Sequence, residues 1–548
     1  MPFAACTGVM PSDGTGGPGE GGNGGDGSGG SPSGGRNGAC REASPFIGPA
    51  PIARLTTVQY TNTLRSLFPG VAVNGLLFSK EIARDDAFVN QGEAQNPSPK
   101  IVEEFNGNAD NVAKAVVAKL PGSVGCTAPV DEVACGNAYV KTLLEKAFRR
   151  PATSEELQRY RALFTTVRAA TGFADAIGDV VRAALQSPHF LYRIERGADP
   201  NASAKVALSP HELATRLSYF LNNNMPDAEL MKAANAGALV QKDELEKQAK
   251  RLLASQAARE VVRDFQSQWL HLDGLNSLVK SPTLYPEFTA ALKTSYSTSL
   301  YKFLDYQTWE NGGRWRELIT DKSAFVDQNL APIYGLANTS TSMNKMTLDD
   351  KRTGLLSQAG LLAALAHVDV DSPTERGLFV LRNILCMHVP DAPADVSTDI
   401  PKSDKPMTMR QKMEDLHSNA GASCKTCHKL IDGIGFGFNN FDSLGRYRTQ
   451  DNGLPTDDRG NIVADSSIDG EFKGVVELSE KIASSIEGRL CYASQVLAYG
   501  RALARENLDE CAAEQLLQST DAENPSLQDL MVGVAVSEGF RSLDKSKP

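Results

Sequence analysis

The five residues Cys424-Lys425-Thr426-Cys427-His428 constrain this chain more than any other part of its sequence. Two thiols three positions apart, with an imidazole directly after them, form the attachment signature of a c-type haem. The thiols add to the haem vinyl groups as thioethers, and the ring nitrogen of the next residue binds the iron as proximal ligand. The pattern therefore predicts one covalent haem c, held by Cys424, Cys427 and His428.

The same two cysteines could instead form half of a zinc site or a redox-active dithiol. A zinc site needs two more ligands, but no second cysteine pair and no His-x3-5-His pattern follows. A thioredoxin-type dithiol is expected near a βαβ pattern, which the sequence lacks. Both alternatives remain open, and haem is the prediction that the spacing favours.

Most of the remaining chain has the apolar periodicity of amphipathic helices. Ser209-Pro210-His211-Glu212 has the residues of a helix start, with Ser209 as N-cap, Pro210 in the first turn and Glu212 completing a capping box. Convincing alternating strand patterns are scarce, so the sequence predicts a mainly α protein. Helical patterns cover residues 101–120, 133–149, 154–188, 209–221, 227–255, 257–270, 285–306, 355–366 and 474–499.

The amino-terminal region has a different composition. Residues 13–38 hold 14 Gly among 26 positions and predict a disordered, flexible tether. Before it, Phe3-Ala4-Ala5-Cys6 resembles a bacterial lipobox, in which Cys6 is lipidated after cleavage. A charged n-region and a full apolar h-region are missing, so we expect residue 1 to lie inside a longer signal peptide. We expect a lipid-anchored protein; the alternative is a chance cysteine in a disordered tail.

The cysteine count supports an exported location. The chain has 9 Cys; removing Cys6, Cys424 and Cys427 leaves an even number, which permits three disulfides in 15 possible connectivities. The pairs closest in sequence are Cys126–Cys135 and Cys491–Cys511, which leaves Cys40 for Cys386. The alternative is that several are buried free thiols. Covalent haem and disulfides both belong to the oxidising side of a bacterial membrane, so the predicted location is periplasmic or cell-surface.

Charge and hydropathy exclude two classes of partner. The formal net charge is −10, and no Lys/Arg-rich run is present, which argues against a nucleic-acid partner. No apolar stretch reaches 18 residues, so membrane attachment is expected only through the lipid.

Several segments resemble the multidomain c-type cytochromes built from planctomycete-cytochrome-C-associated domains of unknown function, found in Planctomycetes and myxobacteria. The segments that carry the resemblance are Arg54-Leu55-Thr56 with Tyr60, Ala147-Phe148-Arg149-Arg150-Pro151, Ser187-Pro188-His189-Phe190-Leu191-Tyr192-Arg193, Leu217-Ser218-Tyr219-Phe220-Leu221, Phe325-Val326, Asn329-Leu330-Ala331, Ser372-Pro373-Thr374-Glu375-Arg376-Gly377, the cysteine pentad, Asn440-Phe441-Asp442, Tyr499-Gly500-Arg501 and Ser537-Glu538-Gly539-Phe540-Arg541.

The resemblance implies a series of helical modules in a fixed order. We expect a Gly-rich tether at 1–45, helical modules at 46–122, 123–200 and 205–340, a haem-binding module at 350–450 and a C-terminal helical module at 455–548. The family usually has Asp-Pro after the haem-binding His, whereas here Asp432 is followed by Gly433. The resemblance implies a fold and a haem, but the reaction of the family is largely uncharacterised.

The sixth position of the iron is less well defined by the sequence. In a helix over 408–417, Met409, Met413 and His417 share one face, and His417 is the candidate sixth ligand. The alternative is that His417 packs or caps locally. His367 and His189 read as helix-end and packing residues rather than ligands.

Other residues near the pentad have two readings each. Phe436, Phe438 and Phe441 are expected to wall the haem edge. Arg446 and Arg448 either bind the haem propionates or form ion pairs with Asp442 and Asp451.

Three functions fit these predictions. The first is an extracytoplasmic c-type cytochrome that transfers single electrons to a redox partner that the sequence does not identify. The second is a haem-dependent oxidoreductase with an open iron site, which the large size of the chain favours. The third is a surface binding module with a structural haem, in which Trp269, Trp309 and Trp315 stack on sugars; spread through helices, these residues read as core instead.

Overall fold

The computed structural model describes residues 40, 44–48, 51–81, 88–95, 98–126, 131–199, 201–202, 204–390, 405–418, 422–509 and 511–546. The predicted tether and the lipobox at Cys6 lie outside the described residues, apart from Cys40 and residues 44 and 45.

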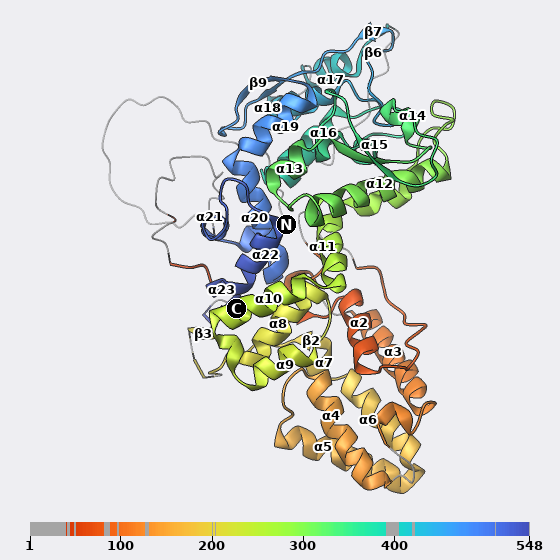
Figure 1. Ribbon diagram of the computed structural model, residues 1–548, viewed down its shortest axis with the longest axis vertical. Helices are drawn as coiled ribbons and strands as arrows, with labels where there is room; N and C mark the ends of the chain where they lie inside the picture. Colours follow the sequence, from red (N-terminus) through yellow and green to blue (C-terminus); the bar gives the residue numbers. More distant parts are fainter. Residues whose placement is uncertain are drawn as a thin grey trace, which may run out of the picture. The chain divides into compact units, whose positions relative to one another are not determined.

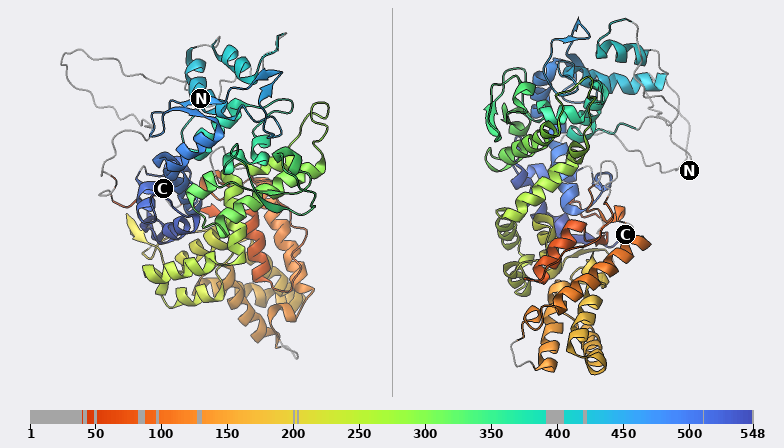
Figure 2. Two further views of the ribbon diagram at one scale, coloured as in Figure 1. Left: turned by 45° about the horizontal axis from the view of Figure 1, so that its top comes forward. Right: turned by 90° about the vertical axis from the view of Figure 1, so that its right-hand side faces the viewer.

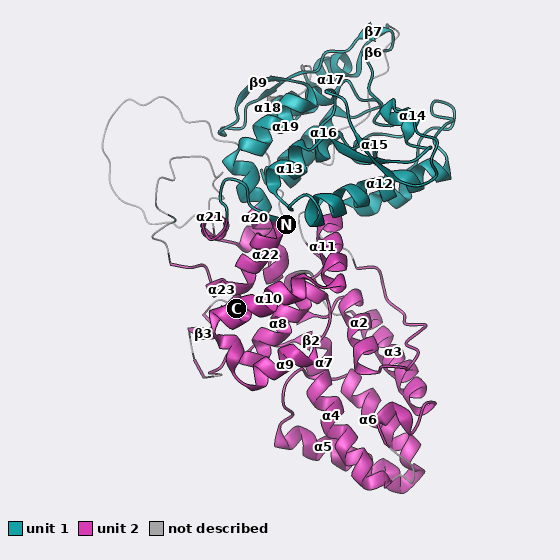
Figure 3. Cartoon of the chain, in the orientation of Figure 1, with its two compact units in different colours: residues 1–42, 270–492, 521–526 teal, residues 43–269, 493–520, 527–548 magenta. Residues whose placement is uncertain are grey.

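The described chain is mainly α-helical, as predicted, and forms two compact units (Figures 1 and 3). Unit 1 comprises residues 1–42, 270–492 and 521–526, and unit 2 comprises residues 43–269, 493–520 and 527–548. Strands in the described residues form short antiparallel pairs, β1–β2, β3–β10, β4–β5, β6–β7 and β8–β9. No helix among the described residues has the length and apolarity that crossing a membrane requires.

Unit 2 is built from helices and two short strand pairs. Its elements are β1 (Ala53–Arg54), α2 (Thr57–Leu67), η1 (Gly92–Ala94), α3 (Pro99–Val117), η2 (Gly122–Val124), α4 (Glu132–Ala147), α5 (Ser154–Thr171), α6 (Phe173–Leu185), α7 (Pro188–Leu191), β2 (Tyr192–Arg193), β3 (Lys205–Ala207), α8 (Pro210–Asn222), α9 (Ala228–Asn235), η3 (Ala238–Val240), α10 (Lys242–Leu253), α11 (Gln256–Trp269), η8 (Arg505–Asn507), α21 (Ala512–Gln518), α22 (Leu527–Val536), α23 (Glu538–Arg541) and β10 (Ser542–Asp544).

Helices α3 to α6 pack together around one apolar core (Figures 1 and 2). The helix predicted over 101–120 corresponds to α3, and its apolar side is buried where it meets α6, with Phe105, Val112 and Val116 inside. The single helix predicted over 154–188 is instead α5 and α6, which meet at Gly172. Periodicity alone does not mark that break because both halves continue the same apolar pattern.

The start of α8 has the predicted capping box. The Ser209 hydroxyl accepts a hydrogen bond from the Glu212 amide, and the Glu212 carboxylate accepts one from the Ser209 amide. Leu213, Leu217 and Leu221 are buried on one side of this helix.

Unit 1 contains the cysteine pentad. Its elements are η4 (Leu272–Ser277), α12 (Ala290–Trp309), α13 (Trp315–Thr320), β4 (Ser323–Val326), α14 (Ala331–Tyr334), β5 (Asn344–Thr347), η5 (Leu355–Ser357), α15 (Ala359–Ala364), α16 (Pro373–Phe379), the π-helical turn η6 (Val380–Ile384), α17 (Met409–Ser418), α18 (Ala422–Gly435), η7 (Phe436–Phe438), β6 (Gln450–Asp451), β7 (Leu454–Pro455), β8 (Arg459–Ile462), β9 (Gly470–Lys473), α19 (Gly474–Ser484) and the first part of α20 (Ile486–Arg501).

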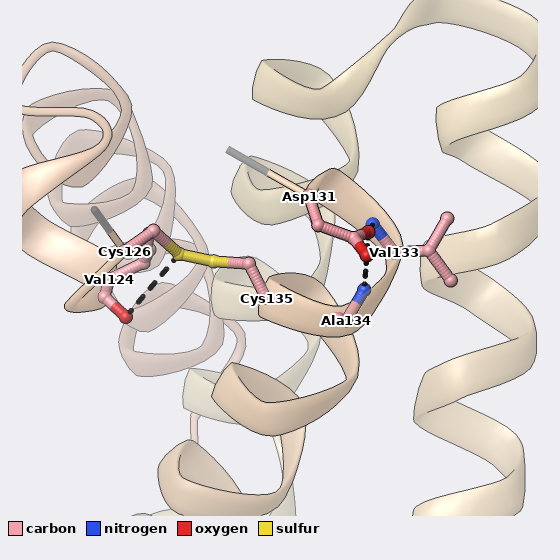
Figure 4. Close-up of a disulfide and its surroundings, with 6 residues drawn as sticks. All are labelled: Val124, Cys126, Asp131, Val133, Ala134 and Cys135. Carbon is pink, nitrogen blue, oxygen red and sulfur yellow. Dashed lines mark hydrogen bonds between the residues drawn. A yellow bond between two sulfur atoms is a disulfide. The ribbon is translucent and has the colours of Figure 1, made fainter. Parts of the chain in front are cut away.

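The six cysteines assigned to disulfides are all disulfide-bonded. The predicted Cys126–Cys135 pair is present in unit 2, next to Asp131, which caps α4 by accepting hydrogen bonds from the Val133 and Ala134 amides (Figure 4). Disulfide bonds indicate an oxidising, extracytoplasmic location.

The other two predicted pairings are wrong, because Cys491 is bonded to Cys386 within unit 1. Cys491 lies on the buried part of α20, with 2% of its surface exposed, and its Cα is 5.2 Å from that of Cys386. Proximity in sequence favoured Cys511 as the partner of Cys491, but helix packing brings a residue 105 positions away into bonding range.

Candidate functional site

A cavity of about 680 Å³ lies beside the cysteine pentad in unit 1. This volume falls within the range of about 300–1,000 Å³ that is typical of small-molecule and cofactor sites. Its walls come from α17, α18 and the β8–β9 hairpin with the residues that follow it, and the residues that line it are Arg410, Glu414, His417, Lys425, His428, Lys429, Asp432, Gly433, Phe436, Arg459, Gly460, Asn461, Val463, Glu471, Phe472, Lys473 and Glu477.

Helix α18 carries the whole pentad. Positions 424, 427 and 428 are three and four residues apart, so they lie on the same face of α18. Cys427 is partly buried, and 26% of the His428 side chain is exposed. The side chain of Cys424 lies outside the described part of the structure.

His417 and His428 meet at one carboxylate, that of Asp432. The Nδ1 atom of His417 is hydrogen-bonded to Asp432 Oδ2, and His428 Nδ1 lies 3.4 Å from the same oxygen. The two imidazole rings stack, with centroids 3.4 Å apart and planes inclined by 22°. These three side chains therefore form one cluster, and their candidate ligand atoms all lie within 4.8 Å of one another.

The environment of Asp432 keeps its carboxyl ionised. Its side chain is 7% exposed, and burial alone raises a carboxyl pKa. The hydrogen bonds from His417 and His428 outweigh this effect and lower the pKa of Asp432. Thr374 Oγ1 donates a further hydrogen bond of 3.0 Å to Asp432 Oδ1 and joins α16 to the cluster.

Gly433 allows β8 to lie directly against α18. A Cβ at this position would come within 2.3 Å of the carbonyl oxygen of Asn461. A side chain is therefore excluded where the family usually has proline. The close approach also places Gly460 and Asn461 in the wall of the cavity.

The cavity wall combines apolar surface with positive charge. Phe436 and Phe472 supply two aromatic rings, and Arg410 lies over the Phe436 ring at 4.5 Å from its centroid. The basic residues of the wall are Arg410, Lys425, Lys429, Arg459 and Lys473, and the acidic residues besides Asp432 are Glu414, Glu471 and Glu477.

The structure brings some of the predicted site residues to the cavity and leaves others elsewhere. His417, His428 and Phe436 line the cavity, whereas Phe438 and Phe441 are buried and do not. Met409 and Met413 share the predicted face of α17, but they are buried in an apolar cluster with Phe436.

Arg446 and Arg448 form ion pairs with Asp442 and Asp451, which is the second of the two roles that the sequence suggested. Arg446 Nε lies 2.7 Å from Asp442, and Arg448 lies 3.1 Å from Asp451 and 2.9 Å from Asp371.

His189, His367, Trp269 and Trp315 do not line the cavity beside the pentad. His189 packs on Phe148 in unit 2, with ring centroids 5.4 Å apart, while His367 is exposed. Trp269 and Trp315 are buried core residues, with 2% and 0% of their surfaces exposed.

Sequence reasoning did not identify Asp432 as the partner of both histidines, nor the β8–β9 hairpin as a cavity wall. Asp432 lies four residues after His428, a spacing that places both on one helix face, so that signal was present. No local pattern indicated the hairpin.

Five family models match the chain in succession. Each is described as a protein of unknown function: DUF1587 at residues 53–118, DUF1595 at 135–195, DUF1592 at 208–336, DUF1588 at 352–451 and DUF1585 at 469–540. The match over 352–451 contains the pentad, His417 and Asp432. No curated protein and no solved structure gives a significant match. The chain therefore belongs to the multidomain proteins built from planctomycete cytochrome C-associated domains, a cytochrome-related group of unknown function.

Proposed function

We propose that this protein is an extracytoplasmic c-type haem protein that transfers single electrons. Cys424 and Cys427 would hold one haem through thioethers, and His428 would bind its iron. The observation that carries the proposal is that His428 lines a cofactor-sized cavity while its Nδ1 faces a buried carboxylate.

The arrangement around His428 suits an iron ligand. Histidines that bind metals donate their other ring N–H to a carboxylate or carbonyl, which fixes the tautomer and the ring orientation. A hydrogen bond donated from Nδ1 to the Asp432 carboxylate, which can only accept, would leave the lone pair of His428 on Nε2 for the iron. Asp432 also adds electron density to the imidazole, which favours the oxidised form of a bound iron.

The cavity wall suits a haem as well. Phe436 and Phe472 supply apolar surface for the macrocycle, and Arg410 and Arg459 supply guanidinium groups of the kind that bind carboxylates. A bound haem c supplies reversible one-electron chemistry at its iron. The protein's own part is to hold, orient and partly desolvate that group.

The role of His417 as sixth ligand stays a prediction, and the stacked geometry does not favour it. Two axial ligands bind iron from opposite sides, whereas the rings of His417 and His428 lie face to face on one carboxylate. If His417 does not bind the iron, the sixth position would be open or filled by another residue. An open position would favour the alternative function, a haem-dependent oxidoreductase.

Absorption spectroscopy tests the proposal. The protein would be exported from cells with a haem-maturation system, and oxidised and dithionite-reduced spectra recorded with and without CO. We expect a pyridine haemochrome spectrum of a two-thioether haem in the wild type, and none in the Cys424→Ser/Cys427→Ser variant. A sharp reduced α band insensitive to CO indicates electron transfer, and rapid CO binding indicates the oxidoreductase. A wild-type protein without covalent haem contradicts both.

A second candidate is a mononuclear metal site formed by His417, His428 and Asp432. Two imidazoles and one carboxylate are the ligand set of mononuclear iron(II) oxygenases, and these ligand atoms already lie within 4.8 Å of one another. Metal analysis of haem-free protein distinguishes the two. One tightly bound metal ion per chain, lost in His417→Ala but retained in Cys424→Ser, supports the metal site.

The location of the protein forms part of the proposal. The disulfides indicate an oxidising compartment, and lipidation at Cys6 would anchor the chain to the membrane surface there. Mass spectrometry of the amino-terminal peptide from the exported protein would detect the diacylglyceryl group. The third hypothesis, a surface binding module, is less favoured, because Trp269 and Trp315 are buried and cannot stack on sugars.

A further inference from the structure

Unit 2 contains a second cavity, of about 320 Å³, where two of the segments that resemble the family meet. The loop after α4 supplies Phe148 to Pro151, and α7 with β2 supplies His189 and Tyr192 to Arg193. The start of α8 closes the remaining side. Four arginines line this cavity, Arg149, Arg150, Arg193 and Arg196, together with His189, His211 and only two acidic residues, Glu195 and Glu212.

The acidic groups at this cavity already have partners. Glu195 forms a bidentate ion pair with Arg216, with 2.8 Å from Arg216 Nε to Oε1. The Glu212 carboxylate accepts hydrogen bonds from the backbone amides of Ser209, Arg196 and Gly197. The nearby Glu156 forms a bidentate pair with Arg150, at 2.7 and 2.9 Å.

Arg149 is buried, and no carboxylate among the described residues pairs with it. It is 3% exposed, and its guanidinium donates to the carbonyl oxygens of His189, Phe190 and Tyr192 at 2.7 to 3.1 Å. These bonds satisfy its N–H groups and hold α7 and β2 in place, but carbonyls carry no charge to offset that of the guanidinium.

Arg193 is buried to a similar extent and has fewer contacts. It is 8% exposed, and within the described residues its guanidinium makes no hydrogen bond or ion pair. Burial, the first cause, and the nearby cations lower the pKa of Arg193 in spite of Glu195.

An unpaired cation is costly inside a protein. Buried charges are normally paired, and an uncompensated one costs several kcal/mol. Here Arg149 and Arg193 face one small cavity whose acidic residues are bound elsewhere. An anion in the cavity would supply both the missing charge and the missing hydrogen-bond acceptors.

We propose that this cavity is a binding site for a small oxyanion, a carboxylate or phosphate group, held by the guanidinium of Arg193 beside Arg149 and Arg150. A planar guanidinium with free N–H groups matches the paired oxygens of either anion. The cavity volume limits the ligand to a small molecule or to the anionic end of a larger one.

Isothermal titration calorimetry on the full protein tests this, with inorganic phosphate and succinate as separate probes against chloride at equal ionic strength. Comparing phosphate with succinate identifies the preferred oxyanion. The variants are Arg193→Met and, as matched control, Arg182→Met. Arg182 is a half-buried arginine of unit 2 that pairs with Asp110 and lies outside the cavity.

We expect one site in the wild type and in Arg182→Met, and at least tenfold weaker binding in Arg193→Met. Because Arg193→Met removes an unpaired buried charge, its melting temperature in chloride should equal or exceed that of the wild type. Adding the preferred anion should raise the melting temperature of the wild type only. Absence of binding of both probes to the wild type, or equal binding by Arg193→Met, would overturn the proposal.

Discussion

The α-carbon of Gly377 in α16 faces α18 so closely that an added Cβ would lie 2.1 Å from the carbonyl oxygen of Ile431. The neighbour is backbone rather than a flexible side chain, so the two helices must separate to admit a methyl group. This contact holds Thr374 at the distance from which it reaches Asp432. The spacing of α16 and α18 therefore sets the contact between Thr374 and the carboxylate that the two histidines share.

We expect Gly377→Ala to destabilise unit 1 by about 1–3 kcal/mol, the cost of overpacking a close contact. Urea unfolding followed by tryptophan fluorescence measures this change, with Trp269 of unit 2 replaced by Phe so that Trp309 and Trp315 report on unit 1. The matched control is Gly274→Ala in η4, where an added Cβ meets nothing within 4 Å and the expected change is about 0.5 kcal/mol or less. Equal unfolding midpoints for the two variants would show that α16 and α18 separate at little cost.

The Cys386–Cys491 disulfide of unit 1 is expected to stabilise the folded protein more than the Cys126–Cys135 disulfide of unit 2. Cys386 and Cys491 close a loop of 105 residues, whereas Cys126 and Cys135 close one of 9. Loop-closure entropy gives about 4.7 kcal/mol for a loop near 100 residues and about 2.7 kcal/mol for one near ten. Replacing each pair with serines and comparing the free energies of unfolding tests this order.

Peptide mapping under non-reducing conditions checks the connectivity itself. A peptide containing both Cys386 and Cys491 is expected in the wild type. A peptide joining Cys491 to Cys511 would instead support the pairing that sequence proximity favoured. In that case the loop closed by Cys491 would be short, and its disulfide would not be expected to stabilise the protein more than Cys126–Cys135 does.

Features that depend on neighbouring residues were predictable from the sequence. The capping box of α8 and the buried stripe of α3 follow from patterns within about twenty residues, and both are present. The helix of Met409, Met413 and His417 was also placed correctly, because four-residue spacing fixes a helix face.

Features that depend on tertiary packing were not predictable in this way. Residues 450–470 have the composition of a linker, yet they contain β6, β7 and β8. Strand β8 carries two polar residues and a glycine among four, so nothing in its pattern distinguishes it from a loop. Its position against α18 depends on Gly433, and the cavity wall depends on that contact.

Asp432→Asn tests the carboxylate that the two histidines share. The amide keeps the shape but loses the charge, so the imidazole of His428 becomes a weaker electron donor. We expect a more positive reduction potential and a lower fraction of covalently attached haem, measured by redox titration and by the pyridine haemochrome assay. The matched control is Glu414→Gln, an exposed carboxylate of the same cavity paired with Arg410, for which little change is expected. Identical potentials for both variants would contradict the role of Asp432.

The pH dependence of stability has a clear contributor in Glu156. Hydrogen bonds from Arg150, the largest cause, lower the pKa of Glu156 to about 2 in spite of burial, which raises it. The pKa is therefore lower in the folded than in the unfolded state. The stabilisation is fully present above the unfolded value near 4.5 and is lost as the pH falls towards 2.

Glu156→Gln isolates this contribution, because glutamine can still accept the capping hydrogen bond from the Thr153 amide. At pH 6 the variant should be less stable than the wild type by about 1–3 kcal/mol, less than the full equivalent of the pKa difference because glutamine keeps the hydrogen bond from the Thr153 amide that contributes to it. The gap should shrink between pH 4.5 and pH 2.5, as measured by urea unfolding with circular dichroism. Glu145→Gln, which removes an exposed carboxylate 3.9 Å from Lys141, serves as control and should show a small gap at every pH. If the difference in unfolding free energy between Glu156→Gln and the wild type did not change with pH, the effect of the substitution would come from packing rather than from the ion pair with Arg150.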